Sequence, residues 1–504
     1  MQQIQDTRDR SVEGAQAARV SVSRPGGQAQ RFDVLVVGDG STAQEAALVA
    51  AQAGRSVALI RPTRDAWDPE GNPTLIYEAL DRLACDEPVG DGWPGQPINV
   101  SDLLNARRHP PSGALESLTG AGVTLLQGAA RFLSPRSISI DDRHVAFQAA
   151  VLAPGLERAI SDLPAHQASA YLTESRLVEL ARVPYRLAVV GTGYHACRWA
   201  DLFRRLGSEV HLVALAERML PEEDPELESI VQEQFARRAI RLHLGCRAIA
   251  LESMGRGKAL TLSGGEGKEK LLVDEILACA PPRLATGELD LAAAGIQGMP
   301  PAMVADRWLR TSNPHVFAIC SHPNADPHAA LAAARVAATN ASARVAWRGA
   351  YHTFDWRLTP RCLRLEQEML IAGTADDEVA RRAGPLSTYH ETVASGATRD
   401  VLRVTVETLS GRPVAVMAVA VKAEMWVGPL LMLMQERRSI AGLARLPLAG
   451  SAHAECLQRM GRRWAAEVRQ RFGAGLCGAA AMWRARTRMW LRGGNRPARG
   501  KCDP

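Results

Sequence analysis

Two stretches of the 504-residue chain share one pattern of apolar and polar positions: Phe32–Arg61 and Arg186–Val213. Each begins with a short apolar run, continues through a glycine-rich turn into a segment of helical length, and ends with a second apolar run. The apolar runs have the length of buried parallel strands. Each stretch therefore predicts a strand–turn–helix–strand unit of the kind that builds a doubly wound parallel sheet.

The turn of the first unit follows the pattern G-x-G-x-x-A. The first glycine of such a turn permits a sharp bend, the second lets a pyrophosphate approach the backbone, and the small third residue lets helix and strand pack closely. The N–H groups of the helix N-terminus then face the phosphate charge. We predict that four residues bind a dinucleotide here: Gly38, Gly40, Ser41 and Ala43. The acid expected about 20 residues later falls at Arg61, which favours the alternative of a unit that kept its packing glycines and lost its ligand.

The second unit repeats the turn with Gly191, Gly193 and Ala196. These three residues are predicted to hold a second pyrophosphate. Two such units in one chain are a stronger signal than either alone, because two bound dinucleotides are what a hydride transfer between cofactors requires.

From about Tyr351 the pattern changes. Apolar and polar positions alternate over Val401–Thr408 and Pro413–Val421, and helical periodicity follows over Gly428–Arg437. From Gln458 the chain reads as a basic amphipathic helix. This part predicts an α+β module without a nucleotide-binding signal.

Charge and hydropathy exclude several classes of partner. The net charge is +6, and no segment of the predicted domains concentrates the arginines, so we expect no nucleic-acid binding. The apolar run 413–434 is interrupted by Lys422 and Glu424, which argues against a membrane span. The first 31 residues lack the apolar core of a signal peptide, so we expect a cytoplasmic protein.

The cysteines are spaced too irregularly for a metal or redox motif, since none form C-x-x-C or C-x4-C. We expect reduced thiols and no metal site. The nine cysteines are Cys85, Cys197, Cys246, Cys279, Cys320, Cys362, Cys456, Cys477 and Cys502.

The order and spacing of these stretches resemble one family, the pyridine nucleotide–disulphide oxidoreductases, flavoproteins that include dihydrolipoamide dehydrogenase, glutathione reductase and mercuric reductase. The resemblance runs from about Phe32 to about Leu457. The first glycine turn is similar to the FAD-binding opening, Ala153-Pro154-Gly155 stands where the family has A-T-G, and the second turn resembles the NAD(P)H motif. LRTSNPHVFAICS is similar to the return strand toward the flavin, and LARLPLAGSAHAECL resembles the C-terminal motif.

The resemblance implies an α/β fold with two Rossmann-like dinucleotide-binding domains and a C-terminal α+β dimerisation domain. It also implies FAD and NAD(P)H as cofactors and a homodimer. The expected segments are a disordered leader at 1–31, a split FAD-binding domain at 32–165 and 285–345, an NAD(P)-binding domain at 166–284, a dimerisation domain at 350–470 and a basic tail at 471–504. Membrane contact by the tail is open, but a dimer-packing helix is the preferred interpretation.

Further site residues follow from the resemblance alone. Gly155 belongs to the flavin-binding motif, and Ser321 stands where the family has the aspartate that holds the ribityl chain. Tyr194 occupies the position of the tyrosine that gates the nicotinamide side of the flavin. Glu217 and Arg218 are both available to the adenosine ribose, so the choice between NADH and NADPH is open.

The reactive centre departs from the family pattern. The C-x4-C disulphide and the lysine that follows it are missing from the matching region Trp67–Ile76, and the lysine's glutamate partner falls at Arg198. The proton-transfer histidine of the C-terminal motif falls at Gly450, with its glutamate partner kept as Glu455 and His453 nearby but out of register. The lysine that follows the disulphide and its glutamate partner are both missing. The loss of both members of this acid–base pair indicates a centre that was re-purposed or retired.

Two functions fit this pattern. The first is an FAD-dependent NAD(P)H oxidoreductase without the redox disulphide, which passes a hydride from NAD(P)H to FAD and on to a small acceptor such as a quinone or oxygen. The alternative is a catalytically inactive homologue that acts as a dimeric scaffold or nucleotide-binding protein. A thiol reductase that uses distant cysteines is disfavoured, because no pair has suitable spacing.

Overall fold

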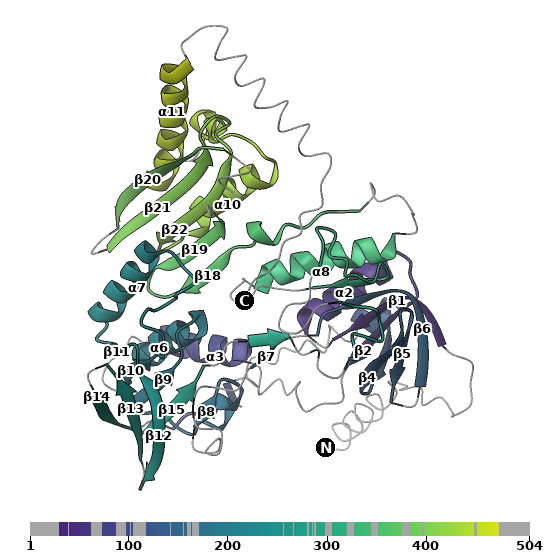
Figure 1. Ribbon diagram of the computed structural model, residues 1–504, viewed down its shortest axis with the longest axis horizontal. Helices are drawn as coiled ribbons and strands as arrows, with labels where there is room; N and C mark the ends of the chain where they lie inside the picture. The colour runs from purple at the N-terminus through teal and green to yellow at the C-terminus, as the bar shows by residue number, and fades with distance from the viewer. Residues whose placement is uncertain are drawn as a thin grey trace, which may run out of the picture.

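The computed structural model describes most of the chain between Gln30 and Phe472 (Figure 1). The described residues are 30–38, 40–61, 73–86, 97–100, 102–103, 117–141, 143–154, 156–158, 163, 171–255, 257–265, 267–279, 282–284, 286, 289–297, 305–319, 327–343, 351–374, 384–395, 398–447 and 451–472. Several predicted features lie outside these ranges: nearly all of the leader and of the basic tail, and the site residues Gly155 and Ser321.

The first sheet carries the amino-terminal glycine turn. Its hydrogen-bonded path is β3 (Thr124–Gln127), β2 (Val57–Arg61), β1 (Gln30–Val37), β6 (Arg143–Leu152), β5 (Ser137–Ile140) and β4 (Ala130–Ser134), and β17 (Val316–Ala318) pairs with β6. The pairs β1–β2, β2–β3, β1–β6 and β6–β17 are parallel. β6 is continuous because it pairs with β1 along almost its whole length.

Two alanine-rich helices, α2 (Ser41–Gln52) and α8 (Pro327–Ser342), lie side by side against one face of this sheet (Figure 1). Small residues let the two helix backbones approach each other closely. The contacting alanines are buried: Ala43, Ala46, Ala47 and Ala50 on α2, and Ala333, Ala334, Ala337 and Ala338 on α8. Segments nearly 300 residues apart in the sequence thus pack together against one sheet.

The second sheet carries the second glycine turn. Its five parallel strands have the order β11 (Arg241–His243), β10 (Glu209–Val213), β9 (Arg186–Val190), β15 (Glu275–Ala278) and β8 (Leu172–Thr173). The helices α6 (Tyr194–Arg205) and α7 (Pro225–Arg237) follow β9 and β10. Phe203 on α6 and Phe235 on α7 are fully buried in the core beneath them.

A three-stranded antiparallel sheet next to this domain was not predicted. It consists of β12 (Arg247–Met254), β13 (Gly257–Gly264) and β14 (Gly267–Val273). The largely apolar run over 271–278 belongs to two strands, β14 and β15. The run divides at Asp274, whose carboxylate accepts hydrogen bonds from the Arg186 backbone and side chain, so that β14 and β15 belong to different sheets.

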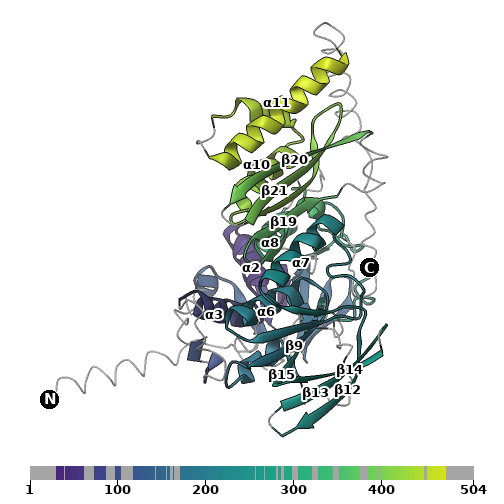
Figure 2. The ribbon, with the colours of Figure 1, turned by 90° about the vertical axis from the view of Figure 1, so that its left-hand side faces the viewer.

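The third sheet is antiparallel and forms the carboxy-terminal module. Its strand order is β18 (Arg361–Arg364), β19 (Glu368–Gly373), β22 (Pro413–Ala420), β21 (Thr398–Glu407) and β20 (Leu386–Ser395). Figure 2 shows α10 (Glu424–Gln435) and α11 (Ala452–Phe472) on the same side of this sheet, with buried Trp426 and Trp464 among the residues between them. Within the described residues, no helix is long and apolar enough to span a membrane.

Two smaller elements connect these parts. The helix α3 (Pro73–Asp86) packs on α6 and on the short 3-10 helix η4 (Ser175–Glu179), which brings a segment from the first domain against the second. The strands β7 (Leu156–Arg158) and β16 (Pro282–Leu284) pair antiparallel where the chain leaves and re-enters the first domain.

Candidate functional site

The first glycine of each predicted dinucleotide turn is required by the protein's own backbone. Gly38 has φ +144°, and a Cβ there would lie 2.0 Å from the carbonyl oxygen of Ala153. Gly191 has φ +150°, and its Cβ would lie 2.6 Å from the carbonyl oxygen of Cys279. No other residue type fits at either position without movement of a neighbouring strand end.

The second glycine of each turn is not required by any protein contact. At Gly40, where φ is −71°, an added Cβ would meet only Thr42 Oγ1, at 3.9 Å. At Gly193, where φ is −85°, an added Cβ would have no neighbour within 4 Å. The space in front of these two glycines is open, which is what a pyrophosphate approaching the backbone needs.

The helices that follow the turns also suit an anion. Gly40 and Gly193 are the N-caps of α2 and α6, and neither helix has a side-chain cap or an acidic residue in its first turn. The first N–H groups of an α-helix have no partner within the helix. Ser41 is exposed at the start of α2, whereas Ala43 and Ala196 are buried beneath the turns. Both turns therefore fit the pyrophosphate of a dinucleotide.

In dinucleotide-binding domains an acidic residue usually binds the hydroxyl groups of the ribose. The residues at the corresponding positions of the two predicted sites differ from this pattern. Arg61 is the last residue of β2 and is partly exposed. At the end of β10, Glu217 is exposed, while Arg218 donates through Nε to Glu228 Oε2 at 2.6 Å. Because Arg218 already has a carboxylate partner, a coenzyme phosphate would have to compete with Glu228 for it.

Tyr194 lies at the start of α6 and is only 3% exposed. Its hydroxyl donates to Glu223 Oε1 at 2.9 Å, and Arg361 donates to both oxygens of the same carboxylate, at 2.7 and 3.0 Å. Burial, with Glu223 adding to it, raises the pKa of Tyr194, so the hydroxyl stays protonated. A gating movement would have to break this hydrogen bond, and the gate remains a prediction.

An aromatic cluster includes Arg198, the residue at the position of the family's glutamate. The guanidinium carbon of Arg198 lies 4.0 Å from the ring centroid of Tyr77 on α3. Tyr77 in turn meets Trp199 edge to face, with ring centroids 5.2 Å apart. A cation–π contact thus joins α3 and α6 here. The sequence showed the charge reversal at Arg198 but gave no signal for its aromatic partner.

A buried carboxylate lies against the same face of α6. Glu174, between β8 and η4, has a fully buried side chain. Its Oε1 accepts a hydrogen bond from Trp199 Nε1 at 2.7 Å and lies 3.2 Å from His195 Nδ1. Sequence reasoning missed this group, because nothing in the local pattern around Glu174 marks it as a partner of α6.

The candidate substitute histidine of the C-terminal motif is held inside its own module. His453 Nε2 lies 2.9 Å from Oδ2 of Asp400, a residue that is 1% exposed and also accepts from Gln367. The ring packs 4.6 Å from that of Trp426. Glu455 is exposed, and Gly450 lies outside the described residues.

No disulphide or metal centre occurs in the described part of the chain. The thiols of Cys197, Cys246, Cys279, Cys362 and Cys456 are free of disulphide bonds. Burial raises the pKa of the Cys197 thiol to about 12, which makes it unreactive. No group of three or more His, Cys, Asp or Glu residues in this part could hold a metal ion.

The chain is similar to several known proteins. A family model described as pyridine nucleotide-disulphide oxidoreductase matches residues 32–341. The mercuric reductase of Staphylococcus aureus is 24% identical over 301 residues, which cover 57% of this chain and 55% of that protein. The dihydrolipoyl dehydrogenase of Thermus scotoductus is 28% identical over 374 residues, covering 70% of this chain and 78% of that protein. This chain thus spans about half the length of the mercuric reductases it matches.

Solved structures show the same fold at low identity. LpdA from Mycobacterium tuberculosis superposes with a TM-score of 0.71 and 20% identity, over 86% of this chain and 99% of that chain. The HOCl-induced flavoprotein disulfide reductase RclA from Escherichia coli gives a TM-score of 0.69 and 17% identity, with the same coverage. The predicted fold class is confirmed.

Proposed function

Because the chain belongs to the pyridine nucleotide-disulphide oxidoreductase family, we propose that it is an FAD-dependent NAD(P)H oxidoreductase that works without the family's redox disulphide. The acceptor would be a small molecule such as a quinone or oxygen. When bound, FAD would supply the hydride chemistry between NAD(P)H and that acceptor. The main task of the protein would then be to bind and orient the two cofactors, with few catalytic side chains of its own.

One observation carries this proposal: the open space at Gly40 and Gly193. The backbone conformation and the neighbouring atoms would allow a side chain at both positions, yet both are glycine. A ligand that passes close to each helix N-terminus explains both glycines at once. In this proposal Gly38 and Gly191 fix the two turns, and Tyr194 gates the nicotinamide side.

The alternative function is a catalytically inactive homologue that serves as a dimeric scaffold or nucleotide-binding protein. The contact between Arg198 and Tyr77 favours it, because a structural cation–π pair connects α3 and α6 where the family has an ion pair close to the flavin. Arg61, at the end of β2, is a second feature in its favour.

The absorption spectrum of the purified protein separates the two functions. The oxidoreductase should be yellow, as purified or after incubation with FAD, and its flavin bands should bleach on addition of NADH or NADPH. A colourless protein that cannot be reconstituted with FAD would rule out the flavoenzyme.

Gly40→Val should abolish the colour and leave the fold intact, because the protein itself has room for the side chain. Gly120→Val, in open surroundings away from the turns, is the matched control.

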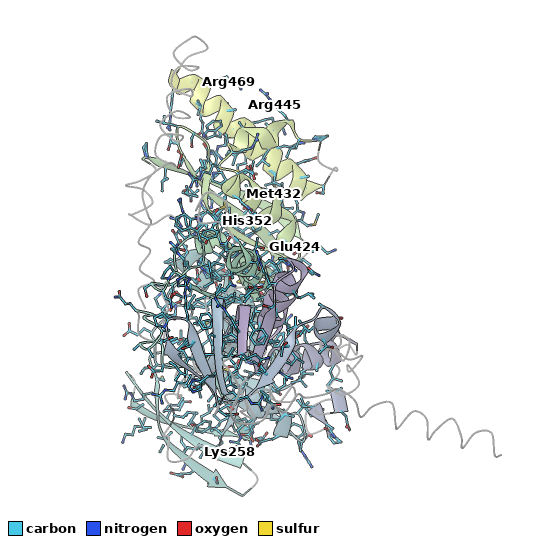
Figure 3. The ribbon with its side chains drawn as sticks, turned by 90° about the vertical axis from the view of Figure 1, so that its right-hand side faces the viewer. Lys258, His352, Glu424, Met432, Arg445 and Arg469 are labelled. Atoms are coloured by element: carbon cyan, nitrogen blue, oxygen red, sulfur yellow. The ribbon has the colours of Figure 1, made fainter. Side chains whose placement is uncertain are left out.

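We further propose that the carboxy-terminal module forms a homodimer. Met425, Met432 and Leu446 of this module are 51%, 68% and 42% exposed, so that their burial against a second copy would be favourable. Figure 3 shows Met432, together with Glu424 and Arg445, on one side of this module. Met432→Glu should shift the sedimentation coefficient from dimer to monomer if this face is the interface, and an unchanged coefficient would exclude it.

A further inference from the structure

An ion pair between two domains lies beside the second glycine turn. Arg361, the first residue of β18 in the carboxy-terminal module, donates to both carboxylate oxygens of Glu223, at 2.7 and 3.0 Å. Glu223 belongs to the loop 214–224, which connects β10 with α7. Figure 1 and Figure 2 both show α7 next to the sheet of the carboxy-terminal module. The proposed function does not yet use this ion pair.

Two hydrogen bonds hold the loop 214–224 on the second glycine turn. The backbone N–H of Leu220 donates to the carbonyl oxygen of Thr192 at 3.1 Å, and Tyr194 Oη donates to Glu223 Oε1 at 2.9 Å. Thr192 lies between the two glycines of the turn, and Tyr194 directly follows the second one. The Glu223 carboxylate is therefore one tyrosine side chain away from the backbone of the turn, where a pyrophosphate is predicted to bind.

The negative charge of Glu223 works against this predicted ligand. A pyrophosphate is an anion, and two negative charges repel each other more strongly where protein, rather than water, lies between them. The Glu223 side chain is only 5% exposed, so solvent and salt screen its charge poorly. Its bidentate contact with Arg361 neutralises the charge. Among the residues that the structure describes, Arg361 is the cation that pairs with Glu223.

A second arginine of the same module makes a similar contact with more exposed acids. Arg403 on β21 pairs with Asp224 Oδ2 and Glu226 Oε2, at 2.7 and 2.8 Å. These two acidic side chains are 41% and 38% exposed, so water screens their charges whether or not Arg403 is present. Arg403 is as buried as Arg361, with side chains 21% and 20% exposed, and is therefore a matched control.

We propose that Arg361 completes the second dinucleotide site. By neutralising Glu223, the carboxy-terminal module makes the second glycine turn able to bind the pyrophosphate of a pyridine dinucleotide. The inference rests on the proposed function, and within it only on a dinucleotide at the second turn. Arg361 acts through Glu223 and is a positioning residue, so the coenzyme site includes a residue more than 160 positions after the turn.

Coenzyme binding to the full-length protein, saturated with FAD, tests this role. Isothermal titration with NAD⁺ and with NADP⁺, neither of which can reduce the flavin, measures the dissociation constant at the second turn. Arg361→Met should raise this constant about five-fold or more, because it leaves the buried Glu223 charge unpaired beside the turn. Arg403→Met should change it by less than about two-fold. The affinity for FAD, at the first turn, should be the same in both variants as in wild type.

A rescue variant separates the effect of charge from that of structure. Arg361→Met combined with Glu223→Gln has lost the ion pair, but no carboxylate remains at position 223 to repel the pyrophosphate. It should therefore bind the coenzyme within about two-fold of wild type. A double variant that binds as weakly as Arg361→Met would overturn the inference, since the ion pair would then act only by holding the two domains together.

Glu223→Gln alone decides the matter if Arg361→Met does not fold. This variant keeps the positive charge of Arg361 near the turn without the opposing carboxylate, so the dissociation constant should fall about two-fold or more. An equal or higher constant would overturn the inference. If wild type binds neither NAD⁺ nor NADP⁺, the proposed function fails and the inference fails with it, whereas binding that Arg361→Met leaves unchanged removes the inference alone.

Discussion

The guanidinium of Arg198 lies 4.0 Å from the ring centroid of Tyr77, where related oxidoreductases are expected to have a lysine–glutamate ion pair. This contact connects two segments that lie far apart in the sequence, and both side chains belong to the junction between α3 and α6. The position that holds a glutamate in the family thus holds the positive charge of Arg198 here, and this charge lies over the aromatic face of Tyr77.

The Arg198–Tyr77 contact predicts a measurable coupling energy. Arg198→Met and Tyr77→Leu each keep the apolar part of the side chain, and the double-mutant cycle isolates the cation–π term. We expect a coupling of about 0.5–2 kcal/mol in the free energy of unfolding from denaturant titration. Additive effects of the two substitutions would show that the contact contributes nothing beyond packing.

Substitution by alanine should destabilise the protein at one glycine of the first turn and have little effect at the other. Gly38→Ala forces a Cβ to within 2.0 Å of the Ala153 carbonyl oxygen at φ +144°, so it should cost about 2–4 kcal/mol. Gly40→Ala should change stability by less than about 0.5 kcal/mol. Thermal unfolding of the protein without added cofactor measures both variants, and equal losses would contradict the division of roles between these glycines.

The buried position of His211 predicts that the folded protein becomes less stable as the pH falls. Its side chain is 6% exposed, and Nδ1 lies 3.0 Å from Nε2 of His243. Burial, with His243 adding to it, lowers the pKa of His211. The unfolded chain therefore binds a proton at a pH where the folded protein does not, and stability should fall as the pH drops below about 6.5. Between pH 7.5 and 5.5 the melting temperature of wild type should fall more than that of His211→Asn, with His144→Gln behaving as wild type.

Glu368 predicts a pH dependence of the opposite sense. Burial and the neighbouring Glu424 carboxyl raise the pKa of Glu368 to about 7. The folded protein keeps this proton at a pH where the unfolded chain has lost it, so the contribution to stability declines as the pH rises from about 4.5 to about 7. Glu368→Gln should melt higher than wild type at pH 8 and lose this advantage near pH 5. The exposed Glu233→Gln is the control, and a constant difference at all pH values would contradict the assignment.

The sequence predicted the two glycine-turn units because their signals are local. Gly38, Gly40 and Ala43 each have a distinct steric reason that can be read within a few residues. The Glu174–His195 pair and the Arg198–Tyr77 contact could not be predicted, since each depends on how segments from different parts of the chain pack together. The sheet of β12, β13 and β14 was missed because apolar positions in it do not mark the buried face alone: Leu272 on β14 is exposed although its neighbours Leu271 and Val273 are buried.

The pairing of β7 with β16 has a consequence for how the chain is assembled. Arg158 and Pro282 face each other across this ribbon, so the start and the end of the inserted domain are neighbours in space although 124 positions separate them in sequence. Opposed residues in an antiparallel pair have Cα atoms only about 5 Å apart. The two chain connections of the inserted domain therefore lie side by side, and α2 and α8, which precede and follow the insertion, pack together in the host domain. A domain attached in this way can be exchanged or diverge without breaking the sheet that carries the first turn.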